Sequence, residues 1–205
     1  MKRCLIIAGG DYAPIGPVEA GDFVLACDRG YAHCLREGIV PDLILGDFDS
    51  YAGALPEGVP VLRYPVEKDD TDTMLAVRWA SEQGFEAVRL CCCFGGRLDH
   101  LLSNVETLYY AAALDMEAEA EDGNNWLRVL RPGAYTLPYR RDRSLSLIAL
   151  TQTVEKLCIR GAKYEVENAR LCRPTTLGQS NAFLRDVELS FESGMLALVC
   201  CRLED

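Results

Sequence analysis

The first 120 residues alternate between short apolar segments and segments with helical spacing. Glycine, proline or aspartate follows most of the apolar segments, as is typical of buried strands. Between several of them, apolar residues recur every three or four positions, which predicts helices. The expected strands are residues 3–8, 23–27, 43–45, 59–63 and 87–93, and the expected helices are 31–37, 73–83 and 98–114. Apolar strands that alternate with helices predict a parallel sheet covered on both faces.

The pattern changes after residue 123, where short strand-like segments follow one another with turn residues between them. The expected strands are residues 126–130, 144–149, 155–159, 182–186, 188–191 and 195–200. Repeated short strands with such punctuation predict an antiparallel sandwich. The expected fold class is therefore α/β, with an N-terminal parallel-sheet α/β domain (residues 1–123) followed by a C-terminal antiparallel β-sandwich (residues 124–205).

The charge of the chain excludes some classes of partner. The 205 residues include 31 acidic and 21 basic side chains, which gives a formal net charge of −10. A broad nucleic-acid-binding surface needs basic patches, so we expect no nucleic-acid partner. No apolar run reaches the roughly 18 to 20 residues that cross a bilayer, so we expect no membrane association. The acidic excess lies wholly in residues 1–123, which contain 22 acidic and 9 basic residues.

Ten cysteines are spread along the chain, mostly within apolar, strand-like segments. There, free cysteine behaves as a small hydrophobic residue. No pair of cysteines has the spacing and partners of a zinc site. We expect reduced core thiols, and therefore a cytoplasmic protein.

Acidic residues gather where the predicted strands end, and this is the edge at which open parallel sheets bind ligands. Asp47 and Asp49 flank one residue directly after a predicted strand. In an extended segment, residues two apart point to the same side, where two carboxylates repel unless a cation lies between them. Mg2+ prefers such oxygen ligands together with phosphates. The alternative is a surface turn in which an aspartate caps the chain.

Two further segments complete this interpretation. Residues 68–72 read KDDTD, in which Asp70 or Thr71 could cap a helix while Asp72 projects from its first turn. After the strand at 87–93, two glycines precede Arg97, whose guanidinium matches phosphate oxygens. Together the segments predict a metal–polyphosphate site, which suits a Mg2+-nucleotide phosphotransferase or phosphatase. The residues alone leave the acceptor open.

The motifs GDFDS (46–50), EKDDTD (67–72) and GGRLDHLLSN (95–104), in this order and spacing, resemble the thiamine pyrophosphokinase family. LACDRG (25–30) adds to this resemblance, and GAKYEVEN (161–168) and GQSNAF (178–183) match more weakly. The resemblance implies an α/β catalytic domain that binds ATP and Mg2+, and a sandwich that binds thiamine and forms the dimer. It also implies a homodimer with active sites between the subunits. The implied reaction transfers the pyrophosphoryl group of ATP to the thiamine hydroxyl and yields thiamine diphosphate and AMP.

The resemblance also implies roles for individual residues. The implied Mg2+ ligands are Asp47, Asp49 and Asp72, and Arg97 would act beside them in catalysis. The residues implied to contact ATP or to organise its pocket are Asp28, Lys68, Asp69, Thr71, Gly96, Arg97 and Asp99. Ser180 and Asn181 match a pair near thiamine, and Tyr164 stands where the family commonly has a tryptophan that stacks on the vitamin. Tyr164 is one departure from the family pattern, and Arg29, in place of a glycine, is another.

Several alternatives remain open at this point. A Mg2+-dependent phosphohydrolase would use the same acidic residues but would need no vitamin-binding domain. A pyrophosphokinase that acts on another small alcohol, such as a pterin alcohol, would keep both. A non-catalytic nucleotide or thiamine sensor would not need all the metal ligands. The products formed from ATP, Mg2+ and thiamine distinguish these classes.

Overall fold

The computed structural model describes residues 1–48, 51 and 53–203 of the chain. Its contacts divide the chain into two units, Met1–Gly123 and Asn124–Asp205, and this boundary coincides with the change in charge and periodicity. The described residues form a mixed parallel and antiparallel sheet structure with three helices. No helix in this part of the chain is both long enough and apolar enough to cross a membrane.

The first unit is built on six parallel strands. They are β1 (Arg3–Ile7), β2 (Phe23–Cys27), β3 (Leu43–Gly46), β4 (Val61–Arg63), β5 (Ala87–Cys91) and β6 (Glu117–Glu121). Their order is β6-β5-β1-β2-β3-β4, and every neighbouring pair is parallel. The chain moves outward from β1 to β4 and then returns to the other side of β1, so the order reverses between β1 and β5. In open parallel sheets, such a reversal opens a crevice at the carboxyl ends of the strands.

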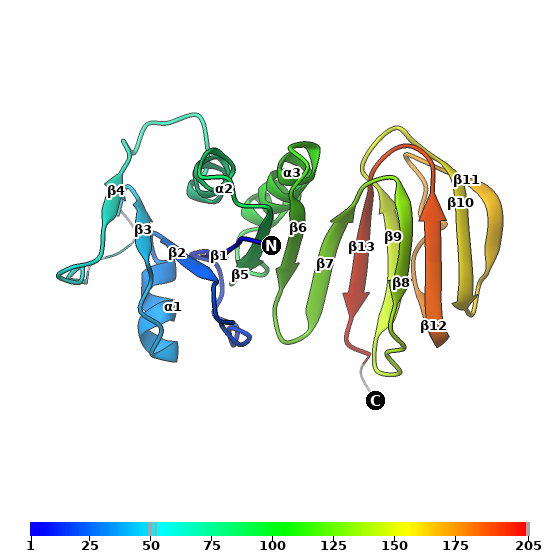
Figure 1. Ribbon diagram of the computed structural model, residues 1–205, viewed down its shortest axis with the longest axis horizontal. Helices are drawn as coiled ribbons and strands as arrows, with labels where there is room; N and C mark the ends of the chain where they lie inside the picture. Colours follow the sequence, from blue (N-terminus) through cyan, green and yellow to red (C-terminus); the bar gives the residue numbers. More distant parts are fainter. Residues whose placement is uncertain (49–50, 52, 204–205) are drawn as a thin grey trace. The chain divides into compact units, whose positions relative to one another are not determined.

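Helices cover both faces of this sheet. Figure 1 shows α1 (Gly30–Glu37) on one face and α2 (Asp72–Glu82) and α3 (Leu98–Ala113) on the other. Because side chains alternate along a strand, Leu5 and Ile7 of β1 pack into the core on the α1 side, with Cys34 of α1. The parallel sheet and its helices therefore follow from the apolar pattern of the sequence.

The buried face of α2 is formed mainly by small side chains. Its buried residues are Thr73, Ala76, Val77 and Ala80, whereas the larger Met74, Leu75 and Trp79 are only partly buried. These smaller side chains allow the helix to pack closely on the sheet. Trp79 instead lies at the border of the core, where its ring is 5.2 Å from that of Phe23.

The second unit contains seven strands whose described pairings are all antiparallel. They are β7 (Asn125–Leu130), β8 (Gly133–Leu137), β9 (Ser144–Ala149), β10 (Thr153–Ala162), β11 (Val166–Cys172), β12 (Asn181–Phe191) and β13 (Leu196–Cys201). A core made mainly of leucine, valine, isoleucine and phenylalanine side chains lies between the described strands. The long strand β12 pairs with β8, β9 and β10, and it replaces the two shorter strands expected at 182–186 and 188–191.

All ten cysteines are free thiols, and seven of them are buried. The expectation that residues 91–93 share one strand was wrong, because β5 ends at Cys91. Cys92 has φ 53°, a left-handed conformation that ends the extended backbone there. The chain therefore turns into the crevice one residue after the strand.

Candidate metal and nucleotide site

Three strands of the first unit end in residues with unusual backbone conformations. Asp28 follows β2 with φ 45°, Phe48 follows β3 with φ 63°, and Cys92 follows β5 with φ 53°. Left-handed backbone at non-glycine residues costs free energy and is concentrated at functional sites. All three turns lie at the carboxyl edge of the parallel sheet.

A cavity of about 670 Å³ lies at this edge, within the first unit. Its volume falls within the range of roughly 300 to 1,000 Å³ that small-molecule sites occupy. Among the described residues, its charged lining consists of Asp11, Asp28, Arg29, Asp47, Lys68, Asp69, Asp70, Asp72 and Arg97. Cys27 and Cys93 also line it, and burial raises the pKa of both, so they remain neutral thiols. The cavity thus combines carboxylates with cationic side chains.

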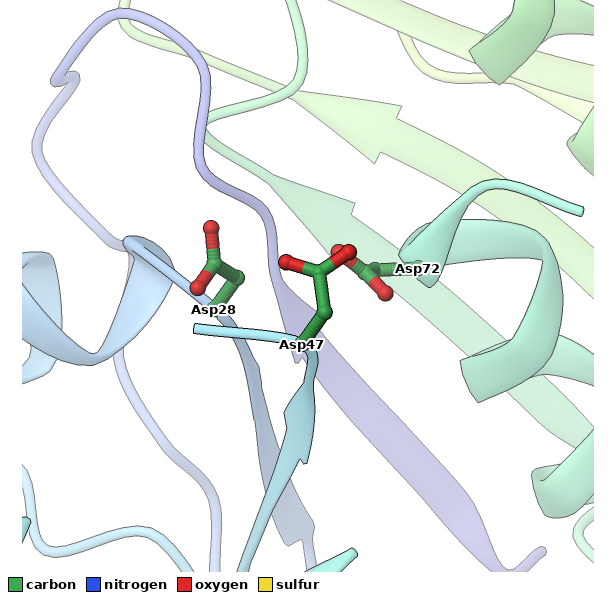
Figure 2. A group of neighbouring side chains, drawn as sticks. All are labelled: Asp28, Asp47 and Asp72. Atoms are coloured by element: carbon green, nitrogen blue, oxygen red, sulfur yellow. The ribbon is translucent and has the colours of Figure 1, made fainter. Parts of the chain in front are cut away.

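Three carboxylates converge at one side of the cavity. Asp28, Asp47 and Asp72 each bring one carboxylate oxygen to within 4.8 Å of the other two, and Figure 2 shows them pointing toward a common space. They come from the end of β2, the end of β3 and the first turn of α2. Asp47 and Asp72 are sequence-predicted ligands, whereas Asp28 was expected only to contact ATP. Asp49, the third predicted ligand, lies outside the described residues.

The oxygen-only donor set fits Mg2+. This ion is commonly bound through one or two carboxylates, with waters and substrate phosphates as its other ligands. Burial raises the pKa of the Asp72 carboxyl, the Lys68 ammonium lowers it in part, and repulsion from Asp47 and Asp28 raises it further. Three crowded carboxylates in one buried corner are stabilised by a cation, which relieves this repulsion.

Lys68 neutralises part of this acidic group. Its Nζ lies 2.6 Å from Oδ2 of Asp47 and 2.9 Å from Oδ1 of Asp72, and all three side chains are largely buried. Burial lowers the pKa of Lys68, but the hydrogen bonds to Asp47 and Asp72 outweigh it, so the pKa is raised and the ammonium stays charged. The sequence predicted that Lys68 contacts the nucleotide, and in the structure the Lys68 ammonium lies among the clustered carboxylates.

Glycine turns line the cavity after β1 and β5, whereas Asp28 and Asp47 follow β2 and β3. Gly95 and Gly96 have φ values of 81° and 65°, and a Cβ on Gly95 would lie 2.7 Å from Oδ2 of Asp11. A Cβ on Gly10 would lie only 2.5 Å from the carbonyl oxygen of Cys92. Both positions therefore require glycine. Asp11 lines the cavity and was missed by sequence reasoning, because it follows a pair of glycines that fits no phosphate-binding motif.

Arg97 lines the cavity, but Asp99 is not among its lining residues. The Arg97 guanidinium binds Asp99 through two hydrogen bonds, of 3.1 Å from Nε and 2.5 Å from Nη2. Hydrogen bonding from Arg97 lowers the pKa of Asp99 to about 2. Asp99 can therefore orient Arg97 without facing the cavity itself.

The segment before α2 behaves as its sequence suggests. Thr71 is the N-cap, and its Oγ1 accepts a hydrogen bond of 3.3 Å from the backbone N–H of Met74. Asp70 binds Arg78 at 3.0 Å. Thr71, Asp69 and Gly96 all line the cavity, as does Asp70.

Three other predicted residues lie together in the second unit. Oδ1 of Asn181 accepts from the Tyr164 backbone N–H at 2.9 Å, and Nδ2 of Asn181 donates to the Tyr164 carbonyl at 2.8 Å. Asn181 is buried, whereas Tyr164 is 59% exposed. Ser180 has φ 59°, and its backbone N–H donates to the Ser146 hydroxyl at 3.1 Å. Asn181 thus fixes the backbone that carries the exposed Tyr164 ring.

A crevice at the carboxyl ends of a parallel sheet, lined by carboxylates, cationic side chains and glycine turns, places the chain among the α/β proteins that bind a small ligand at this edge. Comparison with known proteins identifies the family. The family model "Thiamin pyrophosphokinase, catalytic domain" matches residues 18–119, and "Thiamin pyrophosphokinase, vitamin B1 binding domain" matches residues 135–196. Together these matches cover most of the chain.

Individual proteins agree with the family models. The chain is 30% identical to the thiamine pyrophosphokinase of Bacillus subtilis (strain 168) over an alignment 210 residues long, which covers 97% of this chain and 98% of that protein. Among solved structures, a thiamine pyrophosphokinase from Bacillus subtilis has a TM-score of 0.91 at 27% identity, covering 99% of this chain and all of that one. A thiamin pyrophosphokinase from Geobacillus thermodenitrificans has a TM-score of 0.84 at 31% identity, covering 99% of both chains. The chain belongs to the thiamine pyrophosphokinase family, the enzymes that produce thiamine diphosphate.

Proposed function

We propose that this chain transfers the pyrophosphoryl group of ATP to the hydroxyl of thiamine, with Mg2+ as the metal, and releases AMP. The observation that carries the proposal is the group of Asp28, Asp47 and Asp72, whose oxygens lie within 4.8 Å of one another in a cavity that also contains Arg97. The match of residues 135–196 to a vitamin B1 binding domain supports thiamine as the acceptor and argues against a simple phosphohydrolase.

We assign Asp28, Asp47 and Asp72 as the residues that hold Mg2+. Asp49 remains a predicted ligand on the evidence of the sequence alone. When bound, Mg2+ supplies charge neutralisation for the phosphate oxygens and polarises the phosphoryl group that is attacked. The carboxylates contribute by placing this charge on the same side of the cavity as Lys68.

The nucleotide phosphates are proposed to bind between the carboxylates and the glycine turn. Gly96 allows the backbone to approach closely, and Arg97 supplies a planar guanidinium that matches phosphate oxygens. Lys68 is positioned to exchange its carboxylate contacts for phosphate contacts, because its ammonium already lies in the cavity. Asp69, Thr71 and Asp99 organise this edge, the last of them through Arg97.

In the reaction, the thiamine oxygen attacks the β-phosphorus, and the bond from that phosphorus to the oxygen of AMP breaks in line with it. Negative charge grows on the leaving oxygen and on the transferred group, and Arg97 and Lys68 stabilise it. Phosphoryl transfer of this kind depends mainly on positioning and electrostatics. The hydroxyl proton passes to solvent late in the reaction, because a loose transition state leaves little positive charge on the attacking oxygen, so the chain does not require a strong base.

The second unit is proposed to be the antiparallel β-sandwich that binds thiamine and forms the dimer. Its exposed Tyr164 offers an aromatic face to the cationic thiazolium ring, and cation–π attraction favours this arrangement. The hydrogen bonds of Asn181 to the Tyr164 backbone support this role, and Ser180 lies next to Asn181 in the chain. We propose a homodimer with active sites between the subunits, and a cytoplasmic location that keeps the free thiols reduced.

A product analysis tests the proposed function. The protein is incubated with ATP, Mg2+ and thiamine, and the products are separated by chromatography. We expect thiamine diphosphate and AMP in equal amounts, with no product when EDTA replaces Mg2+. Formation of ADP or free phosphate without thiamine diphosphate would refute the proposal, and a thiamine-independent release of phosphate would indicate a hydrolase.

A further inference from the structure

Two buried polar side chains connect the two sides of the cavity. Thr73 in the first turn of α2 and Asn104 in the second turn of α3 are each less than 9% exposed. The Thr73 hydroxyl donates to Oδ1 of Asn104 at 2.9 Å, and Nδ2 of Asn104 donates to the carbonyl oxygen of Cys93 at 2.8 Å. This pair of hydrogen bonds, from Thr73 to Asn104 and from Asn104 to Cys93, therefore links the helix that carries Asp72 to the turn that carries Gly95. It is called the bridge below.

We propose that Asn104 is a positioning residue, which fixes the distance between the carboxylate side and the glycine-turn side of the cavity. This inference rests on the proposed function, because it assigns the bridge a role in holding the metal ligand and the phosphate contacts in register. Thr73 directly follows Asp72, so the hydrogen bond that anchors Thr73 to Asn104 also restrains the backbone next to Asp72. At the other end, Cys93 lies two residues before Gly95.

The chemistry of the bridge requires an amide. The Cys93 carbonyl can only accept a hydrogen bond, so the Asn104 nitrogen must face it, which leaves Oδ1 to accept from Thr73. An aspartate could not donate to the carbonyl, and a leucine could do neither. Asn104 also lines the cavity, but the hydrogen bonds of its Oδ1 and Nδ2 tie it to Thr73 and Cys93, which supports a role in positioning other groups.

Asn104 is a buried amide on a helix face that is otherwise largely apolar. The buried face of α3 also includes Leu108, Ala111 and Ala112, which pack as ordinary apolar residues. An aliphatic side chain at position 104 would pack there without any hydrogen-bonding requirement, whereas a buried amide must find its partners. The partners that it finds belong to two segments that both line the cavity, one beside Asp72 and one beside the glycine turn. A second hydroxyl strengthens the connection, since Oγ1 of Thr71 lies 3.1 Å from Oγ1 of Thr73.

Thr107 provides a matched control. It is a fully buried threonine on the same helix, and its hydroxyl donates to the Ser103 carbonyl at 2.9 Å, a bond within α3. It is not among the residues that line the cavity. The Thr107→Val and Thr73→Val variants therefore remove the same hydroxyl from a buried helical position, and only one of them breaks the bridge.

The experiment compares Thr73→Val, Asn104→Leu, Thr73→Ser and Thr107→Val with the wild-type protein in the full-length chain. Displacement of reacting groups by about 1 Å can cost roughly 100-fold in rate. We expect Thr73→Val and Asn104→Leu to lower kcat about 10- to 100-fold while the KM for thiamine stays within about twofold of wild type. Thr73→Ser should restore kcat, and Thr107→Val should leave both constants unchanged.

Metal binding supplies a second measurement. Mn2+ binding is followed by electron paramagnetic resonance with α,β-methylene-ATP, which cannot release AMP. We expect weaker Mn2+ binding in Thr73→Val and Asn104→Leu than in Thr107→Val, at equal melting temperatures for the two valine variants. If Asn104→Leu does not fold, Thr73→Val decides the matter.

The inference is overturned if Thr73→Val folds and matches Thr107→Val in both kinetics and Mn2+ binding. It is also overturned if Thr73→Ser is as impaired as Thr73→Val. A wild-type protein that forms no thiamine diphosphate would refute the proposed function instead, and the comparison of Mn2+ binding between the two valine variants would then decide the inference by itself.

Discussion

Replacing Lys68 with methionine removes the ammonium that holds two carboxylates together. Its Nζ lies 2.6 Å from Asp47 and 2.9 Å from Asp72, and the side chains of the three residues are 10 to 20% exposed. A hydrogen bond to a charged group contributes about 1.5 to 3 kcal/mol, and removing one partner of a buried ion pair costs about 3 to 5 kcal/mol. We therefore expect Lys68→Met to lower the free energy of unfolding by about 3 kcal/mol in EDTA.

A divalent cation should compensate for the lost ammonium. In Mg2+, at least half of the lost stability should return, because the metal neutralises the same oxygens. Without nucleotide, Lys68→Met should bind Mn2+ about tenfold more tightly than wild type, which corresponds to about 1.4 kcal/mol of relieved competition. Catalysis should nevertheless fall, since the phosphates lose a cationic contact.

Urea unfolding followed by Trp79 fluorescence measures this effect in a Trp126→Phe background, because the chain contains only these two tryptophans. Lys156→Met is the control, since the exposed Lys156 binds Glu192 at 3.0 Å on the surface. Exposed pairs contribute about 0 to 1 kcal/mol, so this variant should show little loss and no Mg2+ dependence. An equal loss for Lys68→Met in EDTA and in Mg2+, together with unchanged Mn2+ affinity, would refute the reasoning.

Three further predictions follow from the structure. Asp72→Asn should fold normally but lose about 100-fold or more in kcat, because about 3 kcal/mol of metal-dependent stabilisation of the transition state is removed. Circular dichroism and steady-state rates test this, and wild-type turnover with unchanged Mg2+ dependence would contradict it. Tyr164→Ala should raise the KM for thiamine about tenfold, whereas Tyr164→Trp should have a KM at or below the wild-type value. Product formation at saturating ATP measures these constants, and equal KM values for all three proteins would exclude the stacking role. Two hydrogen bonds from Arg3, of 2.8 Å and 2.6 Å, lower the pKa of the Asp22 carboxyl below its ordinary value of 3.8. The pair should therefore add about 2 kcal/mol to the free energy of unfolding above pH 4, and this stabilisation should disappear as the pH falls through the lower pKa of the folded state. Asp22→Asn should remove this part of the acid dependence in urea unfolding between pH 2 and pH 7, and an unchanged pH profile would show that the pair contributes nothing.

The parallel sheet could be predicted from the sequence because its strands are buried on both faces. Such strands are continuously apolar, as in β1 and β2, and their ends are marked by glycine or aspartate. Since parallel strands end at the same edge, the acidic segments after them were expected to meet there. Asp47, Lys68 and Asp72 do meet in one cavity.

Other elements could not be predicted because their patterns are weak. The strand β6 reads EAEAE, in which only the small Ala118 and Ala120 are buried, so its apolar signal is faint. The strand β11 exposes most of its side chains and resembles a loop in composition. The place of Asp28 among the carboxylates and the bridge through Asn104 depend on the packing of segments that are far apart in the sequence, which the residue pattern of a single sequence does not reveal.

The proposed reaction depends on metal binding by Asp28, Asp47 and Asp72. The most direct measurement is a crystal structure of the protein with Mn2+ and α,β-methylene-ATP, in which anomalous scattering locates the metal. We predict an anomalous peak within coordination distance, about 2.0 to 2.3 Å, of oxygens from these three carboxylates and from the phosphates. A peak that contacts the nucleotide but none of the three carboxylates would contradict the account.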